Sequence, residues 1–378
     1  MRLYKAELYK LCHRKIFVIG SACVIGIMLF FFTVWVSEEW AYVDGITYQG
    51  YEGIKVNRKI TEEFEGVLTD DKVNDIIEKY GFPQKVIEDY GGYRDANFLN
   101  AWVVEYLSDG YFRNFDDIKV ASRTYPIGET LLGEASQKSG REIILEYSNG
   151  WNVFLQFMQV GMILGGILIV FSLAGIFAGE GQTKMLSVIF TTKEGRSKDI
   201  TAKYAAAFTV AAGVWCMIVI MGLVLCGLVY GFAGLDCMIG TTKIVFLNTN
   251  RTVTMQRVGS FVITVLLFSL LGILLLCAVT LCISARFRSV FHAVVSAALY
   301  FAAPIRIWLL IFSRGFGGIV RIITSLLWYL LYATPFYLIQ YGTFIDIYQI
   351  RYVIGGIALS AFAYCAVSAY RSYQKQAG

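Results

Sequence analysis

The fold is decided by residues 204–232, whose sequence is YAAAFTVAAGVWCMIVIMGLVLCGLVYGF. This stretch contains no Asp, Glu, Lys or Arg. It is longer than the roughly 20 residues that carry a helix across a bilayer. Its apolar residues do not alternate with polar ones, as they would in a strand of a membrane barrel. The stretch therefore predicts a membrane-spanning helix.

Apolar runs of comparable character occur at five other places in the chain. The composition agrees with them, because 57% of the residues are apolar, 16% are charged and the mean hydropathy is +0.58. These values lie outside the range of soluble globular domains. The predicted spans are 16–36, 153–178, 204–232, 259–283, 290–312 and 352–370. We therefore expect an all-α polytopic membrane protein with six transmembrane helices.

The first run could also be read as a cleavable signal peptide, because basic residues precede it. Residues 16–36 are, however, longer than the apolar core of about 7–15 residues that a signal peptide has. The run also ends at the bulky Trp35 instead of at a small-residue cleavage site. We interpret it as a retained first helix.

Basic residues are concentrated in four segments between or beside the predicted spans. These segments are the flank 1–15, the loop 179–203, the turn 284–289 and the tail 371–378. Positively charged flanks stay on the cytoplasmic side of a membrane, so we expect all four inside, with both termini cytoplasmic. The expected location is the inner (cytoplasmic) cell membrane.

The remaining segments are expected on the outer side. Residues 37–152 are rich in Asp and Glu and lack a long apolar run, which predicts a mostly helical extracytoplasmic domain between the first two spans. Within it, 70–80 and 96–107 read as amphipathic helices, the first ended by Gly81. With no histidine in this domain, its carboxylates are expected to form a solvated acidic surface.

Two further segments, an outer loop at 233–258 and the region 313–351, complete the outer side. Residues 317–341 are apolar enough to resemble a seventh span but contain Arg321 and Pro335. A seventh crossing would move the basic tail outside. We therefore expect a re-entrant helical segment before the last span, with seven crossings as the alternative.

Two cytoplasmic segments have properties suited to binding a partner. In 1–15 the apolar residues Leu3, Tyr4, Leu8 and Leu11 have helical spacing, which predicts an interfacial elbow helix. A simple basic flank is the alternative. The loop 179–203 contains apolar residues that would be costly in water, so we expect them to enter a protein groove. The alternative is that they fold back on the bilayer.

Motifs for catalysis and for cofactor binding are missing from the sequence. The chain has eight cysteines without CxxC spacing, two histidines and no G-x-x-x-x-G-K-[ST] phosphate loop. We therefore expect no catalytic, cofactor or metal site, no nucleic-acid partner, and no ATPase activity in this chain.

The sequence resembles ABC-2-type ABC transporter permeases at several points. The inner loop has Glu180 just after the second span and then MLSVIFTTKEGRSKDITAKY at 185–204, which is similar to the inner loop of that family. The opening MRLYKAELYKLCHRKIF at 1–17 and EYSNGWNVF at 146–154 also look like family segments. The likeness covers most of the chain and is weakest in the acidic domain and around 317–341.

This resemblance implies a coupling helix at 182–190 that seats in a separate nucleotide-binding subunit, with Arg196 and Lys203 anchoring its exit. The elbow helix would brace the same subunit. ATP would bind to that partner, and two permease chains, identical or paralogous, would assemble. The implied coupling residues are Glu180, Lys184, Met185, Leu186, Ile189, Phe190, Arg196 and Lys203.

The expected function is the permease pathway for ATP-driven export. Few charged residues interrupt the spans, which favours a hydrophobic, amphipathic or peptide-like substrate over a small ion. The alternative is a membrane-anchored sensor or scaffold whose outer domain binds a ligand without transport.

Overall fold

The computed structural model describes residues 2–85, 93–110, 120–191, 197–239, 256–312, 330–340 and 350–375. The chain forms two compact units. Unit 1 comprises Met1–Met28, Met158–Met221 and Thr264–Gly378. Unit 2 comprises Leu29–Phe157 and Gly222–Ile263.

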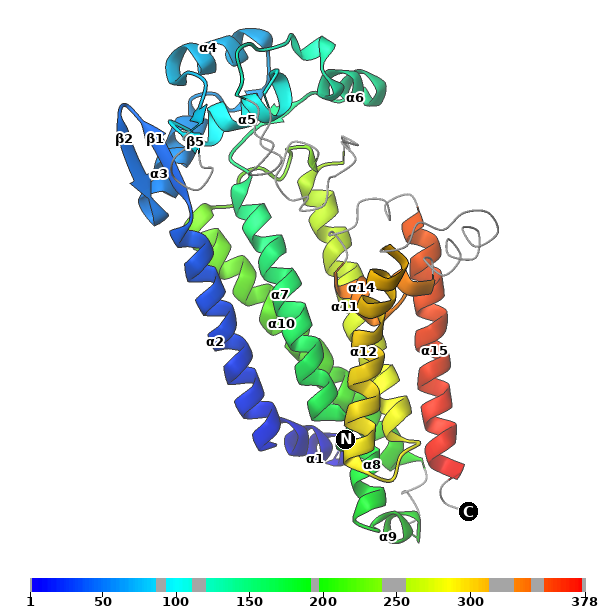
Figure 1. Cartoon of the computed structure of the whole chain (residues 1–378). Helices are drawn as coiled ribbons and strands as arrows, with labels where there is room; N and C mark the ends of the chain where they lie inside the picture. Colours follow the sequence, from blue (N-terminus) through cyan, green and yellow to red (C-terminus); the bar gives the residue numbers. More distant parts are fainter. Residues whose placement is uncertain are drawn as a thin grey trace. The chain divides into compact units, whose positions relative to one another are not determined.

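Six helices are long and apolar enough to cross a membrane, which confirms the predicted number of spanning helices among the described residues. In the first, third and last of these helices along the chain, only 17–28% of the most apolar stretch is buried within the protein. Most of their apolar surface therefore needs lipid as its solvent. The helices are α2 (Lys15–Ser37), α7 (Asn149–Leu173) continued by α8 (Gly175–Gln182), α10 (Lys198–Tyr230), α11 (Val258–Ser284), α12 (Val290–Phe312) and α15 (Arg351–Lys375) (Figure 1).

The helices extend beyond several of the predicted bounds. The α7 and α8 pair continues to Gln182 and α10 begins at Lys198, so the predicted loop 179–203 is helical at both ends. A short helix, α9 (Leu186–Thr191), lies between them. The last span likewise continues into the predicted tail. Charged residues such as Lys and Glu are good helix formers, so the end of an apolar run does not mark the end of a helix.

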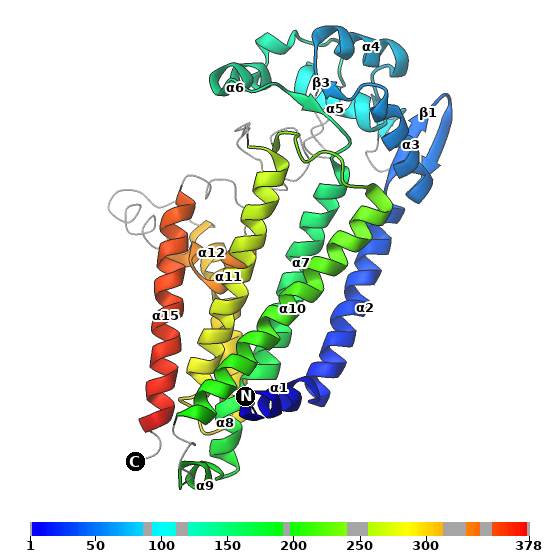
Figure 2. The same ribbon diagram turned by 180° about the vertical axis from the view of Figure 1, so that it is seen from behind.

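Small residues let the helices of unit 1 approach closely. A Cβ added at Gly161 or Gly165 of α7 would lie within 2.8 Å of Ile218 on α10, and one at Gly166 would lie 2.7 Å from Phe301 on α12. Glycine therefore permits helix contacts that any side chain would block. Figure 2 shows α7, α10 and α11 from behind.

A short helix, α14 (Pro335–Ile339), packs inside unit 1 against α12. It also covers Gly272, near the middle of α11, where an added Cβ would lie 2.7 Å from Ile339. The amide of the buried Gln340 donates to the carbonyl of Gln159 at 2.9 Å. Residues 313–329 and 341–349 lie outside the described residues, so the re-entrant segment stays a prediction.

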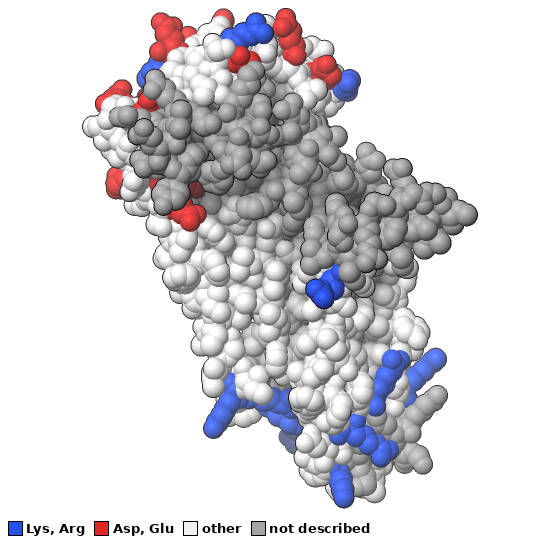
Figure 3. All heavy atoms as spheres, in the orientation of Figure 1, with Lys and Arg blue, Asp and Glu red and all other residues white. Residues whose placement is uncertain are grey.

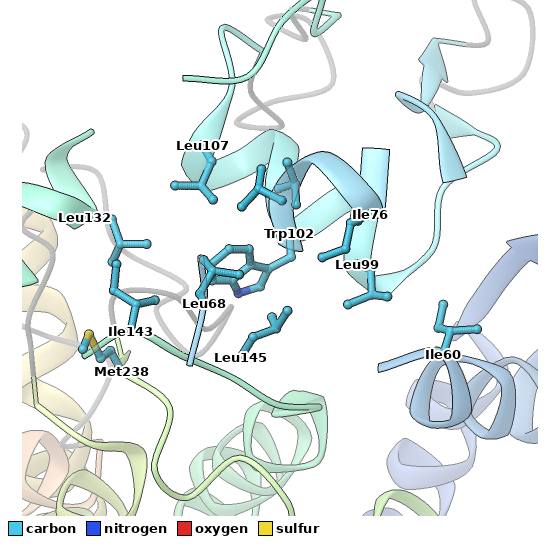
Figure 4. Packing of buried hydrophobic residues seen from close by; sticks show 12 residues of the cluster. Ile60, Leu68, Ile76, Leu99, Trp102, Leu107, Leu132, Ile143, Leu145 and Met238 are labelled. Atoms are coloured by element: carbon cyan, nitrogen blue, oxygen red, sulfur yellow. The ribbon is translucent and has the colours of Figure 1, made fainter. Parts of the chain in front are cut away.

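Unit 2 contains the helices α3 (Gly50–Glu62), α4 (Asp70–Tyr80), α5 (Phe98–Leu107) and α6 (Leu131–Ser139). The predicted helix at 70–80 is confirmed, with Thr69 accepting from the Lys72 N–H at its start and Gly81 at φ +68° at its end. The helices pack around one hydrophobic core that includes Ile76, Leu99 and Trp102 (Figure 4).

The chain is mostly helical, as expected, but the described residues of unit 2 also form three short two-stranded antiparallel sheets that were not predicted. They pair β1 (Trp40–Val43) with β2 (Ile46–Gln49), β3 (Gly66–Val67) with β6 (Ile144–Leu145), and β4 (Gln84–Lys85) with β5 (Tyr93–Arg94). The first hairpin turns at Asp44 and Gly45, both at positive φ. An Asp-Gly pair between two apolar stretches is a strong hairpin signal. This hairpin was not predicted.

Each unit carries its own pattern of charge (Figure 3). In unit 1 the blue Lys and Arg side chains gather around α1 (Arg2–Cys12) and around the ends of α8 and α15. In unit 2 the red Asp and Glu side chains gather over the small helices. The segment predicted to be acidic is therefore acidic on its surface.

Candidate functional site

The helix is interrupted at Ala174, between α7 and α8, and a hydroxyl from α11 hydrogen-bonds the backbone there. Ser284 Oγ accepts from the N–H groups of Phe177 and Ala178 at 3.1 Å each. The same hydroxyl donates to the Ala174 carbonyl at 2.7 Å. A side chain inserted among backbone groups in this way is one of the recognised causes of a helix kink.

One face of α8 is fixed against the beginning of α12. Ala174, Ala178 and Ala293 form a buried cluster at this contact. Just beyond it, the Gln182 side-chain oxygen accepts from the Val290 N–H at 3.2 Å. The small residues bring the two helices close together, so α8 has a defined position in unit 1.

The opposite face of α8 carries Glu180, which belongs to a buried ion cluster. Lys203 on α10 lies between Glu180 and Asp199, with an N–O distance of 2.5 Å to each carboxylate. The Lys203 side chain is only 1% exposed, whereas the carboxylates are 12% and 16% exposed. A buried ammonium needs such partners because desolvation of an isolated charge costs several kcal/mol. The structure thus brings together Glu180 and Lys203, two residues that the resemblance implied.

Aromatic side chains surround this cluster. The Tyr373 hydroxyl on α15 hydrogen-bonds Glu180. The Tyr373 ring stacks at tilted angles with Phe177 and Phe190, at centroid distances of 4.4 and 5.3 Å. Through these contacts the cluster connects α8, α9, α10 and α15 within unit 1.

The corner between α1 and α2 approaches the same region. The Arg14 guanidinium donates to the Ser172 carbonyl at 3.3 Å. Burial lowers the pKa of Arg14, while Glu7 and then Glu180 oppose that change. Arg14 remains charged in any case, since its ordinary pKa is far above neutrality. The N-terminal segment therefore contributes a cation next to the Glu180 site.

The predicted coupling residues follow α8. Lys184 occupies a turn at φ +57°, and Met185 begins the approach to α9. Met185 is 52% exposed and Val188 61% exposed, while Phe190 is 8% exposed against Tyr373. Ile189 is half-buried. Nothing is described of the Leu186 side chain, and Arg196 lies outside the described residues.

The predicted elbow helix corresponds to α1. The solvent exposure of its apolar residues increases towards the N-terminus. Leu11 is 2% exposed, Tyr4 and Leu8 are half-buried, and Leu3 is 41% exposed. The Tyr4 hydroxyl hydrogen-bonds Thr209 on α10 at 3.0 Å. The helix is therefore anchored at its C-terminal end and at Tyr4, and it leaves Leu3 uncovered.

Sequence reasoning missed Asp199, Tyr373 and Ser284 as members of this region. Asp199 and Lys203 are four residues apart on one helix, which is a spacing that pairs opposite charges. That signal was available in the sequence. Tyr373 and Ser284 reach the site only through tertiary packing, and no local pattern indicates them.

The cluster consists of two carboxylates, one ammonium group and one phenol that contact one another. No group of three or more metal-ligating side chains occurs in the described part of the chain. Comparison with protein-family models, with curated proteins and with solved structures gives no match to this chain.

Proposed function

We propose that this chain is the membrane-spanning permease subunit of an ABC-2-type ABC transporter. A separate subunit would bind and hydrolyse ATP, and two permease chains would form a pathway that exports a hydrophobic, amphipathic or peptide-like substrate. The observation that carries this proposal is the two-sided packing of α9 and of Met185, which directly precedes it: Met185 and Val188 are exposed, whereas Phe190 is buried.

The buried side of α9 contacts residues through which a movement of α9 would be transmitted to other helices. Phe190 contacts Tyr373, which binds Glu180, which pairs with Lys203. A push on α9 would therefore reach the ends of three long helices through packed side chains. Interfaces of this kind tend to shift as rigid bodies between discrete arrangements.

The outward side of α9 provides a surface for a soluble partner. Met185 and Val188 are apolar and more than half exposed, on a segment that also carries Lys184. Apolar side chains in water favour a protein groove, and methionine adapts to the shape of such grooves. In the proposed orientation this segment and the ends of α1, α8 and α15 are cytoplasmic, and the acidic segment 37–152 is extracytoplasmic.

We expect the double substitution Met185→Asp with Val188→Asp to abolish binding of the ATPase subunit. Two carboxylates would have to be desolvated in the groove, which is strongly unfavourable. The measurement is affinity purification of the tagged chain from membranes, followed by mass spectrometry for ABC ATPase subunits and by an assay of ATP hydrolysis. Leu186→Asp is expected to act in the same direction.

The control is Val120→Asp, which changes an exposed valine of unit 2 and should leave ATPase association intact. If no ABC ATPase co-purifies with the unmodified chain, the transporter proposal is wrong. If one co-purifies equally with the double variant, α9 is not the coupling surface. The sensor or scaffold alternative expects no dependence on α9 at all.

A further inference from the structure

One face of α1 is fixed against the rest of unit 1. The Tyr4 hydroxyl hydrogen-bonds Thr209 of α10 at 3.0 Å. At the corner between the two helices, the N–H groups of Phe17 and Val18 of α2 donate to the Arg14 carbonyl at 2.9 and 3.0 Å. Both ribbon views show α1 turned away from the axis of α2 at this corner (Figure 1, Figure 2). The opposite face of α1 therefore has a defined position beside the first turn of a membrane-spanning helix.

That opposite face is exposed and combines cationic with aromatic side chains. Lys5, Tyr9 and His13 follow one another at intervals of four residues, so they lie along one side of the segment. All three are exposed, and the Tyr9 ring stacks on the His13 ring with a centroid distance of 3.8 Å. Arg2 and Lys10 flank this line and are exposed as well. We call the surface formed by these five residues the basic face of α1.

The cations of the basic face are poorly neutralised within the protein. Arg2 and Lys5 form no ion pair with the described residues. Lys10 lies 3.6 Å from the Glu7 carboxylate, and its side chain is 48% exposed. Residues 1–16 contain five Lys or Arg and one Glu, which gives a formal net charge of +4, whereas the whole chain has +5. The basic face therefore attracts an anionic partner.

The corner beside the basic face is in contact with lipid. Ile16 and Ile19, in the first turn of α2, are 59% and 60% exposed on a helix that is long and apolar enough to cross a membrane. Lys15 adjoins Ile16 and is exposed too. Leu3, near the start of α1, is also apolar and exposed. Cations and aromatic rings that adjoin lipid-facing residues are typical of a helix in the headgroup layer of a membrane.

We propose that the basic face of α1 binds the headgroups of anionic phospholipids in the adjacent leaflet. Arg2, Lys5 and Lys10 donate charged hydrogen bonds to the phosphate oxygens, and the Tyr9 ring lies at the boundary with the acyl chains. The lipid around Ile16 favours this occupant over a soluble protein, because the same leaflet reaches the corner between α1 and α2. This role goes beyond the proposed transport function and does not depend on it.

The test places a fluorophore on the basic face. Ala6→Cys, at an exposed position of α1, is made in a full-length chain whose natural cysteines are replaced by serine or alanine, and is labelled with nitrobenzoxadiazole. The protein is reconstituted in phosphatidylcholine nanodiscs that contain the same small fraction of nitroxide-labelled phosphatidylglycerol or nitroxide-labelled phosphatidylcholine. We expect phosphatidylglycerol to quench with a relative affinity at least about fivefold higher, which is the preference that one Lys or Arg near an anionic surface provides. Equal quenching by the two lipids would overturn the proposal.

Variants that remove charge locate the effect on α1. The triple substitution Arg2→Gln, Lys5→Gln and Lys10→Gln should remove most of the preference for phosphatidylglycerol. The matched control removes three charges from other exposed positions of unit 1, through Lys198→Gln, Arg288→Gln and Arg371→Gln, and should retain it. Circular dichroism and gel filtration verify that each variant is folded. An equal loss in the two triple variants would assign the preference to the general charge of unit 1 and refute a site on α1.

The competing occupant of the basic face is the ATPase subunit that the proposed function implies. With that occupant the label would lie in water when the permease chain is alone, so neither lipid would quench it. The triple variant of α1 would then lose the co-purifying ATPase, and this result would replace lipid by the soluble subunit as the partner. The quenching measurement contains neither ATPase nor nucleotide, so it and the transport proposal can fail separately.

Discussion

Lys203 shows how much of the candidate site depends on one side chain. Its ammonium group lies between two carboxylates, Glu180 and Asp199, and is almost completely buried. The pairing offsets the cost of desolvating three charges at once, although it need not add net stability. Glu180 also accepts the Tyr373 hydroxyl, so the cluster fixes where α8, α10 and α15 meet.

We expect Lys203→Met to destabilise the protein by about 3 kcal/mol or more, because it leaves two carboxylates facing each other in a buried place. The measurement is the apparent melting temperature of the purified protein in detergent. Lys198→Met, which changes an exposed lysine of the same helix, is the control. Adding Glu180→Gln and Asp199→Asn to Lys203→Met should recover part of the loss. Equal melting of the two single variants would contradict this role for Lys203.

Sequence patterns indicated only part of this cluster. Glu180 and Lys203 were expected at the site because of a family resemblance, and their direct pairing was not foreseen. Asp199 could have been found from its i,i+4 spacing to Lys203. Tyr373 lies 193 residues from Glu180, and such a contact follows from how the helices pack. Local sequence carries no information about it.

Among the elements, the long helices were the easiest to predict, because each apolar run needs lipid regardless of its neighbours. Their ends were harder to predict. Residues 179–182 and 198–203 are polar in part and still helical, so the helices continue beyond the predicted apolar spans. The hairpin of β1 and β2 was missed although Asp44 and Gly45 mark its turn, because the acidic composition of the segment had suggested helices only.

The contact between α11 and α15 gives a second prediction. Cys282 of α11 and Cys365 of α15 act on each other electrostatically, both cysteines are free, and Arg286 just after α11 hydrogen-bonds Ser368 of α15 at 2.8 Å. We expect copper phenanthroline to oxidise this pair to a disulfide that joins the two helices, since a disulfide forms only between cysteines whose Cα atoms lie within about 7 Å of each other. Mass spectrometry of proteolytic fragments would identify the linked peptides.

Cys365→Ser should abolish that cross-link. Cys277 is also on α11, but it is completely buried. It is an internal control that should stay reduced. Linkage of Cys365 to a cysteine of another helix, such as Cys216 of α10, would show that α15 packs elsewhere. The experiment therefore tests the helix arrangement of unit 1 independently of function.

At the scale of the whole molecule, the charge pattern predicts the orientation in the membrane. Basic side chains gather around α1, α8 and α15 of unit 1, and acidic ones over the helices of unit 2 (Figure 3). Positive flanks are retained in the cytoplasm. If each of the six long helices crosses the membrane once, successive connecting segments lie on opposite sides. The orientation predicted from the charges then places residue 184 inside and residue 142 outside.

We expect Lys184→Cys to be protected from a membrane-impermeant maleimide in intact cells and labelled after permeabilisation. Glu142→Cys, at an exposed position of unit 2, should be labelled in intact cells. Both variants are made in a chain whose natural cysteines are replaced by serine or alanine, so that each reports one position. Labelling of Lys184→Cys in intact cells would reverse the orientation and remove α9 from any cytoplasmic motor.

The joint at Ser284 has a consequence for how this molecule can change over evolution. The three hydrogen bonds of its hydroxyl are all made with backbone peptide groups of residues 174–178. They do not involve the side chains of these residues. A substitution at the serine cannot be rescued by a matching substitution opposite it, because peptide groups do not mutate. Methods that search for pairs of positions changing together would find no signal at this joint, although it sets the direction of the chain towards α9.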